Sequence, residues 1–462
     1  MDRATTGRSK GIEKGSSPPH QAIYDLLFAL LLVLLSGFAL IGTAGVPFHP
    51  DESTQLFMSS DFEALAAPGS LAWSPLPQDP LRQHYRLIDA PLTRYLLGLG
   101  RMTAGLAPLP ADWDWGKDWE ANRLAGALPA PDLLQTGRMT ITLLLPFSLL
   151  FTYLLGRKSA YPLAGLIAAA LLGTSALTLL HARRAMAEGP LLFGVTLFLS
   201  TLPGSGRRPW LTGLAAALAF NAKQSAAALF PVGLLAAAWL EGGLLQDKAR
   251  AIRGAVIYTA AFCLLIAALN PVWWSSPLPA LRASLAERSA LLERQTADAQ
   301  RLGNGQYLET KAQRAAALLA NLYFTPPAFA EVANYRDHTA AAEKAYLQQP
   351  GHQILRSLAG GGLLLFLTLL GMVLACLHLR RAGPADRRML VLLLLATIFQ
   401  VGFQLILVPL SWQRYAIAIL PLACWWAGYA GADLGSVLAE AAGILKLKAR
   451  PPSAAQAGKP GR

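Results

Sequence analysis

Long apolar segments separated by short basic loops run along most of the chain. The first, Tyr24–Ala44, is about long enough to cross a bilayer and longer than a signal-peptide core, so we expect it to remain as a span. Nine further apolar segments follow it, at Met139–Leu155, Pro162–Leu180, Pro190–Leu202, Trp210–Ala222, Ala226–Leu240, Ile252–Leu269, Leu355–Leu379, Met389–Leu407 and Ala416–Ala432. The pattern therefore predicts an all-α polytopic membrane protein, a bundle of about ten transmembrane helices.

Two hydrophilic stretches, residues 46–135 and 271–353, are too long to be simple connectors and too polar to span a bilayer. We expect both to be extracytoplasmic loops of a membrane domain that covers residues 22–433. Residues 1–21 are polar and basic and are expected to form a disordered cytoplasmic tail. Residues 434–462 are expected to form a second, basic cytoplasmic tail.

Helical patterns occur inside both long loops. Ser53–Ala66 is expected to form a short helix whose start is capped by Asp51 or Ser53. In Pro91–Leu106, apolar side chains recur at helical spacing with Arg94 and Arg101 on the other side. This pattern is typical of a helix that lies in the membrane interface. The charged run Leu278–Asn321 is expected to be a helix that covers the bundle.

Composition agrees with a membrane protein. The 462 residues are 54% hydrophobic and 15% charged, whereas soluble domains carry roughly 25% charged residues. The formal net charge of +13 would suggest a nucleic-acid partner in a soluble chain, but here the basic residues sit in short loops, where they set topology. All three cysteines, Cys263, Cys376 and Cys424, fall within predicted spans, so no disulfide framework is expected.

Basic residues in the loops indicate the orientation. With the N-terminus inside, the cytoplasmic side holds Arg157-Lys158, Arg207-Arg208, Lys248, Arg250, Arg253, Arg380-Arg381, Arg387-Arg388, Lys446, Lys448 and Arg450, as the positive-inside rule requires. The doublet Arg183-Arg184 is the exception, because it falls on the outer side. We expect both termini to be cytoplasmic and, from the Ala-, Leu- and Arg-rich composition, a bacterial inner membrane.

Charged residues of the outer side gather at one depth. Asp51 and Glu52 directly follow the first span, where two adjacent carboxylates are costly unless they are paired or functional. Turns far apart in sequence add Arg138, His181, Arg183, Arg184, Glu188, Lys223, Arg414 and Tyr415 to the same layer. Arginine and lysine suit the oxygens of a phosphate, and their attraction is screened less where water is scarce. The layer therefore predicts a phosphate-bearing substrate next to a carboxylate.

The order of these landmarks resembles the polyprenyl-phosphate-dependent glycosyltransferases of the glycosyltransferase-C fold. Protein O-mannosyltransferases and aminoarabinose transferases are familiar members of that family. The resemblance covers the chain from Tyr24 to about Ala432 and rests on six motifs in order. These are Asp51-Glu52, Ala90-Pro91-Leu92, Arg138, Arg184 with Glu188-Gly189-Pro190-Leu191, Lys223 in Asn221-Ala222-Lys223, and Arg414-Tyr415 with Pro421.

Three positions depart from the family's pattern. Ala90 replaces the first proline of a Pro-Pro-Leu segment, and Arg94 stands where mannosyltransferases tend to carry lysine. Glu188 replaces the commoner aspartate and is followed by an inserted glycine. These departures bear on which subfamily the chain resembles, and therefore on which acceptor it uses.

The resemblance implies a single displacement that inverts the anomeric carbon of a sugar carried on polyprenyl phosphate. Because phosphate is already a good leaving group, the reaction needs a base for the acceptor hydroxyl and cations for the departing phosphate. We assign catalysis to Asp51 as base, with Glu52 beside it, and binding of the donor phosphate to Arg138, Arg183, Arg184, Lys223 and Arg414. Substrate-binding roles are assigned to His84, Asp89, Arg94, Glu188 and Tyr415. The acceptor is a hydroxyl of a protein, a lipid or a glycan, and no nucleic acid is expected.

Each assignment has a structural alternative. Asp51 could cap a helix, Glu52 could form an interfacial ion pair, and the cations could be interfacial anchors. Tryptophans in the outer loops could stack on sugar or belong to an aromatic belt: Trp113, Trp115, Trp119, Trp273 and Trp274.

No definite cofactor is implied. His49, His84 and His181 could join carboxylates around a divalent metal ion, but their spacing matches no ligand pattern. A transporter or flippase for a lipid-linked or anionic substrate is the main competing function, and a membrane scaffold is a third. Charges at the rim rather than at mid-membrane, without a clear internal repeat, favour the enzyme.

Overall fold

The computed structural model describes residues 19–159, 161–239, 247–303, 305–332 and 334–448. Most of the tail expected over residues 1–21 lies outside the described residues, as do residues 449–462 of the second tail. The last helix continues through residues 434–448 of that tail and ends at Lys448.

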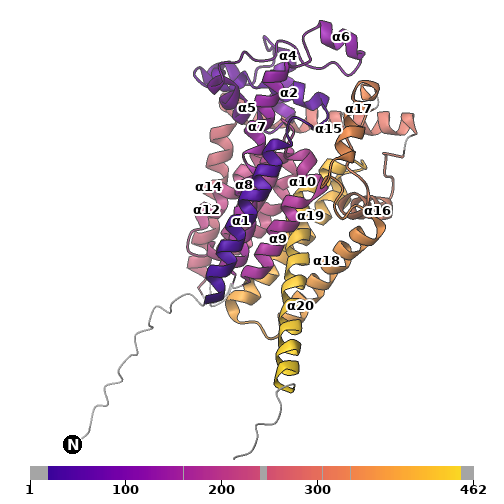
Figure 1. Ribbon diagram of the computed structural model, residues 1–462. Helices are drawn as coiled ribbons and strands as arrows, with labels where there is room; N and C mark the ends of the chain where they lie inside the picture. Colours follow the sequence, from indigo (N-terminus) through magenta and orange to yellow (C-terminus); the bar gives the residue numbers. More distant parts are fainter. Residues whose placement is uncertain (1–18, 160, 240–246, 304, 333, 449–462) are drawn as a thin grey trace, which may run out of the picture.

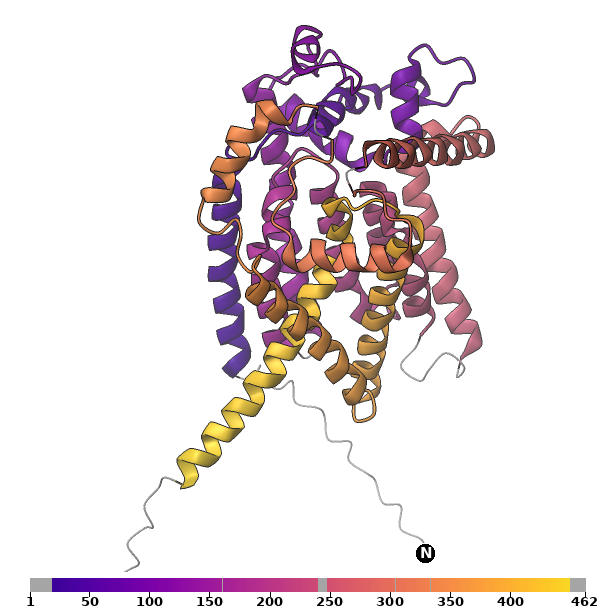
Figure 2. The same cartoon turned by 90° about the vertical axis from the view of Figure 1, so that its right-hand side faces the viewer.

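Long helices run side by side as a bundle (Figures 1 and 2). The start of α1 and the end of α20 lie at the same end of this bundle. The bundle contains α1 (Pro19–Ile41), α8 (Leu145–Lys158), α9 (Pro162–Thr174), α10 (Ala176–His181), α11 (Glu188–Thr201), α12 (Pro209–Ala222), α13 (Phe230–Ala238), α14 (Lys248–Leu269), α18 (Leu358–His378), α19 (Pro384–Leu407) and α20 (Leu420–Lys448).

Further helices, most of them short, gather at the opposite end of the bundle, where the long helix α15 lies across the bundle axis (Figures 1 and 2). They are α2 (Pro50–Met58), α3 (Asp61–Ala64), α4 (Pro80–Ile88), α5 (Leu92–Thr103), α6 (Trp119–Leu124), α7 (Pro131–Thr142), α15 (Pro277–Leu302) and α17 (Arg336–Gln348). A further helix, α16 (Lys311–Leu319), also runs crosswise. The described residues contain no β-strand, only an isolated antiparallel bridge between Tyr307 and Leu410.

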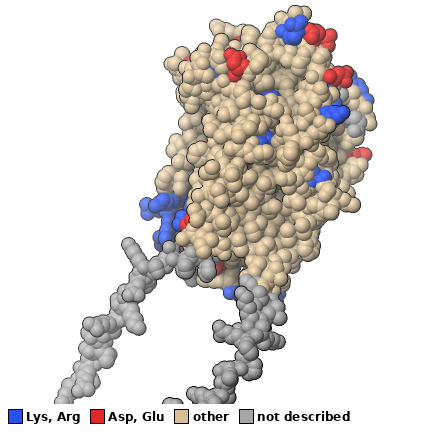
Figure 3. Space-filling model, in the orientation of Figure 1, with Lys and Arg blue, Asp and Glu red and all other residues tan. Residues whose placement is uncertain are grey.

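By length and composition, five helical stretches among the described residues could cross a membrane: Gln21–Ile41, Pro131–Lys158, Lys248–Leu269, Leu358–His378 and Pro384–Leu407. On the face drawn in Figure 3, charged side chains lie mostly towards the two ends, and a broad uncharged belt separates them. This surface is that of an integral membrane protein, because charge is costly against hydrocarbon. The all-helical fold is confirmed, whereas the number of spans stays a prediction.

Two predicted loop helices are interrupted. Ser53–Ala66 divides into α2 and α3, and α2 is capped by His49, not by Asp51 or Ser53. His49 takes this position because Pro50 occupies the first turn, where a missing N–H costs nothing. Leu278–Asn321 divides into α15 and α16 at Gly303, whose φ of 59° lies in the left-handed region that glycine adopts without a Cβ clash.

The helix α5, predicted to lie in the interface, turns its basic side to the protein. Its arginines, Arg94 and Arg101, are buried, whereas Leu99 and Met102 are about half exposed. Arg101 pairs with Glu63 and Arg94 with Asp61, so the protein neutralises both buried cations. The apolar side of the helix is therefore free to face the membrane, and the basic side faces the protein.

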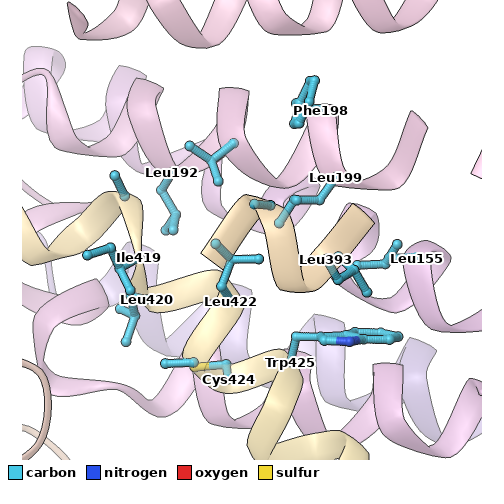
Figure 4. Packing of buried hydrophobic residues seen from close by; sticks show 14 of the residues in the cluster. Leu155, Leu192, Phe198, Leu199, Leu393, Ile419, Leu420, Leu422, Cys424 and Trp425 are labelled. Carbon is cyan, nitrogen blue, oxygen red and sulfur yellow. The ribbon is translucent and has the colours of Figure 1, made fainter. Parts of the chain in front are cut away.

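Leucine, alanine and aromatic side chains of α8, α11, α19 and α20 form the main core (Figure 4). Close backbone approaches make this packing possible, and the tightest joins α18 to α20. A methyl group at Gly371 would overlap the carbonyl oxygen of Trp426. Glycine at this position therefore lets the two helices touch.

Replacing Gly371 by alanine is expected to destabilise the protein by at least about 1–3 kcal/mol, because a rigid backbone atom occupies the place of the new methyl group. Gly362→Ala on the same helix is the matched control, since no heavy atom lies within 4 Å of a Cβ there. Thermal unfolding in detergent measures both. Equal melting temperatures for the two variants would contradict this account of the helix contact.

Candidate active site

A cavity of about 590 Å³ opens at the end of the bundle that carries the short helices. Its walls come from α2, α4, the start of α11, the residues after α12, α15, the segment around residue 331 and the short helix η6 (Gln413–Ala418). Seven of the predicted site residues line it: Asp51, His84, Asp89, Glu188, Lys223, Arg414 and Tyr415. Five others do not: Glu52, Arg94, Arg138, Arg183 and Arg184.

Asp51 lies in the first turn of α2, so its carboxylate projects from the helix start into the cavity. A capping box fixes this turn: the backbone N–H of Asp51 donates to His49 Nδ1 (3.1 Å), and the His49 N–H donates to Glu52 Oε2 (3.1 Å). The Asp51 carboxylate accepts a hydrogen bond from the Arg414 guanidinium. About a third of the Asp51 side chain is exposed, which leaves it open to a substrate.

Glu331 is the functional candidate that the sequence reasoning missed. Its carboxylate contacts Arg414 Nε at 3.3 Å and His49 Nε2 at 2.8 Å. Because His49 Nδ1 already accepts from the Asp51 N–H, its Nε2 must carry the proton and donate to Glu331. The carboxylate thereby links η6 to the cap of α2.

The pKa of Glu331 reflects these partners. Burial by itself raises it, but Arg414 and His49 more than offset the burial, and the pKa ends well below its ordinary value. Glu331 therefore stays ionised at neutral pH. One feature of the sequence could have pointed to Glu331: it is the sole charged residue between Arg314 and Arg336.

Lys223 and the buried Glu188 form a second ion pair in the cavity wall. Lys223 Nζ donates to Glu188 Oε1 at 2.5 Å, and the other Glu188 oxygen has no hydrogen-bond partner. The ammonium also lies 5.1 Å from the centre of the Tyr415 ring, which stacks on Trp412. Arg414 covers the Trp412 ring at 4.9 Å. Both cations are thus held against aromatic faces, where cation–π attraction orients them.

Glu52 and Arg138 lie behind the cavity as a pair. Arg138 Nε and Nη2 each donate to the Glu52 carboxylate at 2.8 Å, and Glu52 also accepts from the backbone of His49 and Ala185. Burial raises the pKa of Glu52, but Arg138 more than offsets it and the pKa is lowered. The pair joins α2 to α7 and leaves little capacity for substrate.

Arg183 and Arg184 bind backbone carbonyls. Arg183 donates to the carbonyls of Ala39 and Phe38 (2.9 and 2.6 Å), and Arg184 to those of Pro47 and Phe329 (3.2 and 3.0 Å). Both side chains are buried. These hydrogen bonds connect the doublet to the end of the first span and to loops distant in sequence. They give the basic doublet a structural role that the positive-inside rule did not explain.

The α4 side of the cavity holds the remaining predicted residues. Burial raises the pKa of Asp89, and Arg288 on α15 opposes that shift most strongly. Arg94 lies behind Asp89 and donates to its backbone carbonyl at 2.7 Å. His84 Nδ1 lies 2.9 Å from Glu287, so this histidine connects α4 to α15.

Histidines do not converge on one centre. His49 contacts Glu331, His84 contacts Glu287, and His181 is buried without a hydrogen-bond partner. Among the described residues, no group of three or more His, Cys, Asp or Glu side chains could hold a metal ion.

The sequence matches no family model and no curated protein. The structure is similar to the oligosaccharyltransferase of Archaeoglobus fulgidus in complex with zinc and sulfate (14% identity, TM-score 0.51, 91% of this chain and 51% of that one). It also matches that enzyme tethered to an acceptor peptide (12%, 0.50, 92% and 52%) and, at a TM-score of 0.47, ArnT from Cupriavidus metallidurans bound to undecaprenyl phosphate (12%, 94% and 66%). The chain thus spans about half the length of the oligosaccharyltransferase. Its fold is of the glycosyltransferase-C type, as the order of the sequence motifs predicted.

Proposed function

We propose that this protein transfers a sugar from a polyprenyl-phosphate-linked donor to a hydroxyl group of an acceptor, on the extracytoplasmic side of a membrane. The carrying observation is that one cavity holds a partly exposed carboxylate, Asp51, with two cations that are largely but not fully buried, Lys223 and Arg414. The similarity to an oligosaccharyltransferase in fold supports the general class of reaction. The bacterial inner membrane and cytoplasmic termini belong to the same proposal.

Lys223 and Arg414 bind the donor phosphate in this proposal. Their partners are the carboxylates of Glu188, Asp51 and Glu331, so a phosphate dianion competes with carboxylates for cations that are already positioned. Arg414 has two carboxylate partners, and a phosphate that takes the place of Asp51 leaves Glu331 still holding the guanidinium. Donor binding thereby frees the Asp51 carboxylate for chemistry.

The freed carboxylate then accepts the proton of the acceptor hydroxyl. The hydroxyl oxygen forms a bond to C1 of the donor sugar, the bond from C1 to the phosphate oxygen breaks, and its electron pair leaves with the polyprenyl phosphate. Attack on the face opposite the phosphate inverts C1. Lys223 and Arg414 stabilise the charge that builds on the departing phosphate, and cations with little exposure are effective because water screens them less.

Purified protein in detergent, supplied with polyprenyl-phosphate sugars, tests the proposal directly. Release or transfer of the sugar by the wild type is the expected result. Tight donor binding without turnover would favour the transporter or flippase, which requires the same charges but no reaction. Absence of both binding and turnover for every donor would overturn the proposal.

Replacing Lys223 by alanine is expected to weaken binding of undecaprenyl phosphate by about 10- to 100-fold, the range for loss of one charge-assisted hydrogen bond. Lys344→Ala is the matched control, because Lys344 is exposed on α17 and away from the cavity. Equilibrium binding in detergent measures both affinities. Equal affinity of wild type and Lys223→Ala would remove Lys223 from the phosphate site.

A further inference from the structure

Aromatic side chains of the outer loops form a cluster beside the proposed base, which we define as Phe48, Trp113, Trp115, Trp119, Tyr335 and His338. Trp113 packs edge-on against both other tryptophans, at 6.5 Å from Trp115 and 5.7 Å from Trp119. The ring centres of Tyr335 and Trp115 lie 6.2 Å apart, and the His338 ring stacks on the Trp119 ring with 4.7 Å between their centres. The cluster connects the segment before α6 to α17. Both α6 and α17 lie at the outer end of the molecule (Figure 1).

Trp115 is the member of this aromatic cluster that lines the cavity. Its side chain is 39% exposed, whereas Trp113 and Tyr335 are almost fully buried. The Trp115 ring lies 6.4 Å from the ring of His49, the residue that caps the helix carrying Asp51. Asn334 Nδ2 donates to its backbone carbonyl at 3.1 Å. An exposed indole is thus held in a fixed place near the proposed base.

Three side chains of α15, Arg294, Gln295 and Asp298, provide polar groups in the same cavity. Because the backbone N–H and C=O groups of a helix are already bonded to each other, this wall offers side-chain donors and acceptors and no free backbone edge. One common mode of peptide recognition adds an extended strand to such an edge, and this wall does not provide one. A ring with several hydroxyl groups fits a wall that combines an aromatic face with carboxylate, amide and guanidinium groups.

We infer that the acceptor is a carbohydrate, whose sugar ring stacks on Trp115 and presents a hydroxyl to Asp51. The inference rests on the proposed function for the transfer itself and adds the chemical class of the acceptor. The indole face carries negative potential, so it attracts the C–H groups on one face of a sugar ring. The hydroxyl groups at the ring edge then donate to carboxylates or accept from Arg294 and Gln295.

The test uses the full chain in detergent with manno-, gluco- and chito-hexasaccharides and a Ser/Thr-containing peptide as candidate acceptors. We expect the wild type to bind and use at least one hexasaccharide. Trp115→Ala should raise KM for that sugar by about 10-fold or more, while acceptor-independent hydrolysis of the donor stays within about two-fold. Trp115→Phe, which keeps an aromatic face, should recover part of the affinity.

Trp210→Ala is the control, because Trp210 is half exposed at the start of α12 and does not line the cavity. An unchanged sugar KM in Trp115→Ala, or use of the peptide with no hexasaccharide bound, would overturn the inference. Calorimetric binding of the hexasaccharide separates the two proposals. If sugar binding depends on Trp115 but no donor is ever consumed, the proposed transfer fails and the carbohydrate site stands.

Discussion

Replacing Asp51 by asparagine is expected to lower sugar transfer by about 10²–10⁴-fold, the usual contribution of a general base. The amide has nearly the same shape, so it preserves the start of α2 but cannot take a proton. Because Asp51 also pairs with Arg414, the substitution releases that cation for the donor phosphate. Binding of polyprenyl phosphate should therefore be unchanged or tighter while turnover falls, and the two measurements together distinguish a base from a structural residue.

Asp132→Asn is the matched control for this experiment. Asp132 is exposed in the first turn of α7, where its carboxylate accepts only from the neighbouring Leu133 N–H (2.8 Å). The same chemical change should leave transfer intact there. A fully active Asp51→Asn variant would show that another group takes the acceptor proton, and the proposed mechanism would fall with it.

Removal of Arg138 is expected to have the largest effect on stability. Arg138→Ala leaves the Glu52 carboxylate buried and without the two hydrogen bonds that Arg138 donates to it. The loss should lower the free energy of unfolding by about 3–5 kcal/mol. Thermal unfolding in detergent should show a large fall in melting temperature. The double variant Glu52→Gln with Arg138→Met should recover part of this loss, because it removes both charges. The amide keeps one of the two oxygens that accept from the His49 and Ala185 N–H groups, so one of these hydrogen bonds is lost.

The exposed pair of Arg123 and Glu120 provides the comparison. Arg123→Ala removes the same type of interaction in contact with water, where it is worth less than about 1 kcal/mol. If Arg138→Ala were as mild as Arg123→Ala, Glu52 would not depend on Arg138, and a catalytic role for Glu52 would regain support. If both single variants at the buried pair abolished transfer without loss of stability, the same conclusion would follow.

The candidate site contains as many formal anions as cations among its lining residues, and most are paired. Asp51 and Glu331 share Arg414, Glu188 holds Lys223, and Asp298 pairs with Arg301. Pairing keeps Arg414, Lys223 and their partners charged where little water reaches and fixes their positions before substrate binds, whereas Asp298 and Arg301 are exposed. A phosphate therefore meets cations already in position, although it must compete with their carboxylate partners.

Local sequence patterns predicted a large part of the architecture. Apolar runs located several bundle helices to within a few residues, as for Ile252–Leu269, which lies within α14, whereas α20 continues well beyond the predicted end at Ala432. The runs missed breaks inside loops, because a single residue such as Gly303 decides them through its backbone conformation. The pattern of α5 also could not show which partners its arginines have, since the partners of Arg94 and Arg101 come from a separate helix turn, at Asp61 and Glu63.

By itself, the sequence determined that this chain is a helical membrane protein with carboxylates and cations at the ends of its apolar segments, since composition and periodicity are local properties. Only the tertiary structure decided which of those charges share a cavity. Asp51 meets Arg414 across 363 positions, and Glu331 meets His49 across 282, whereas Glu52, Arg138, Arg183 and Arg184 are held by other parts of the protein. The physical reason is that a charge takes whatever partner packing brings within hydrogen-bond distance, and packing depends on the whole bundle.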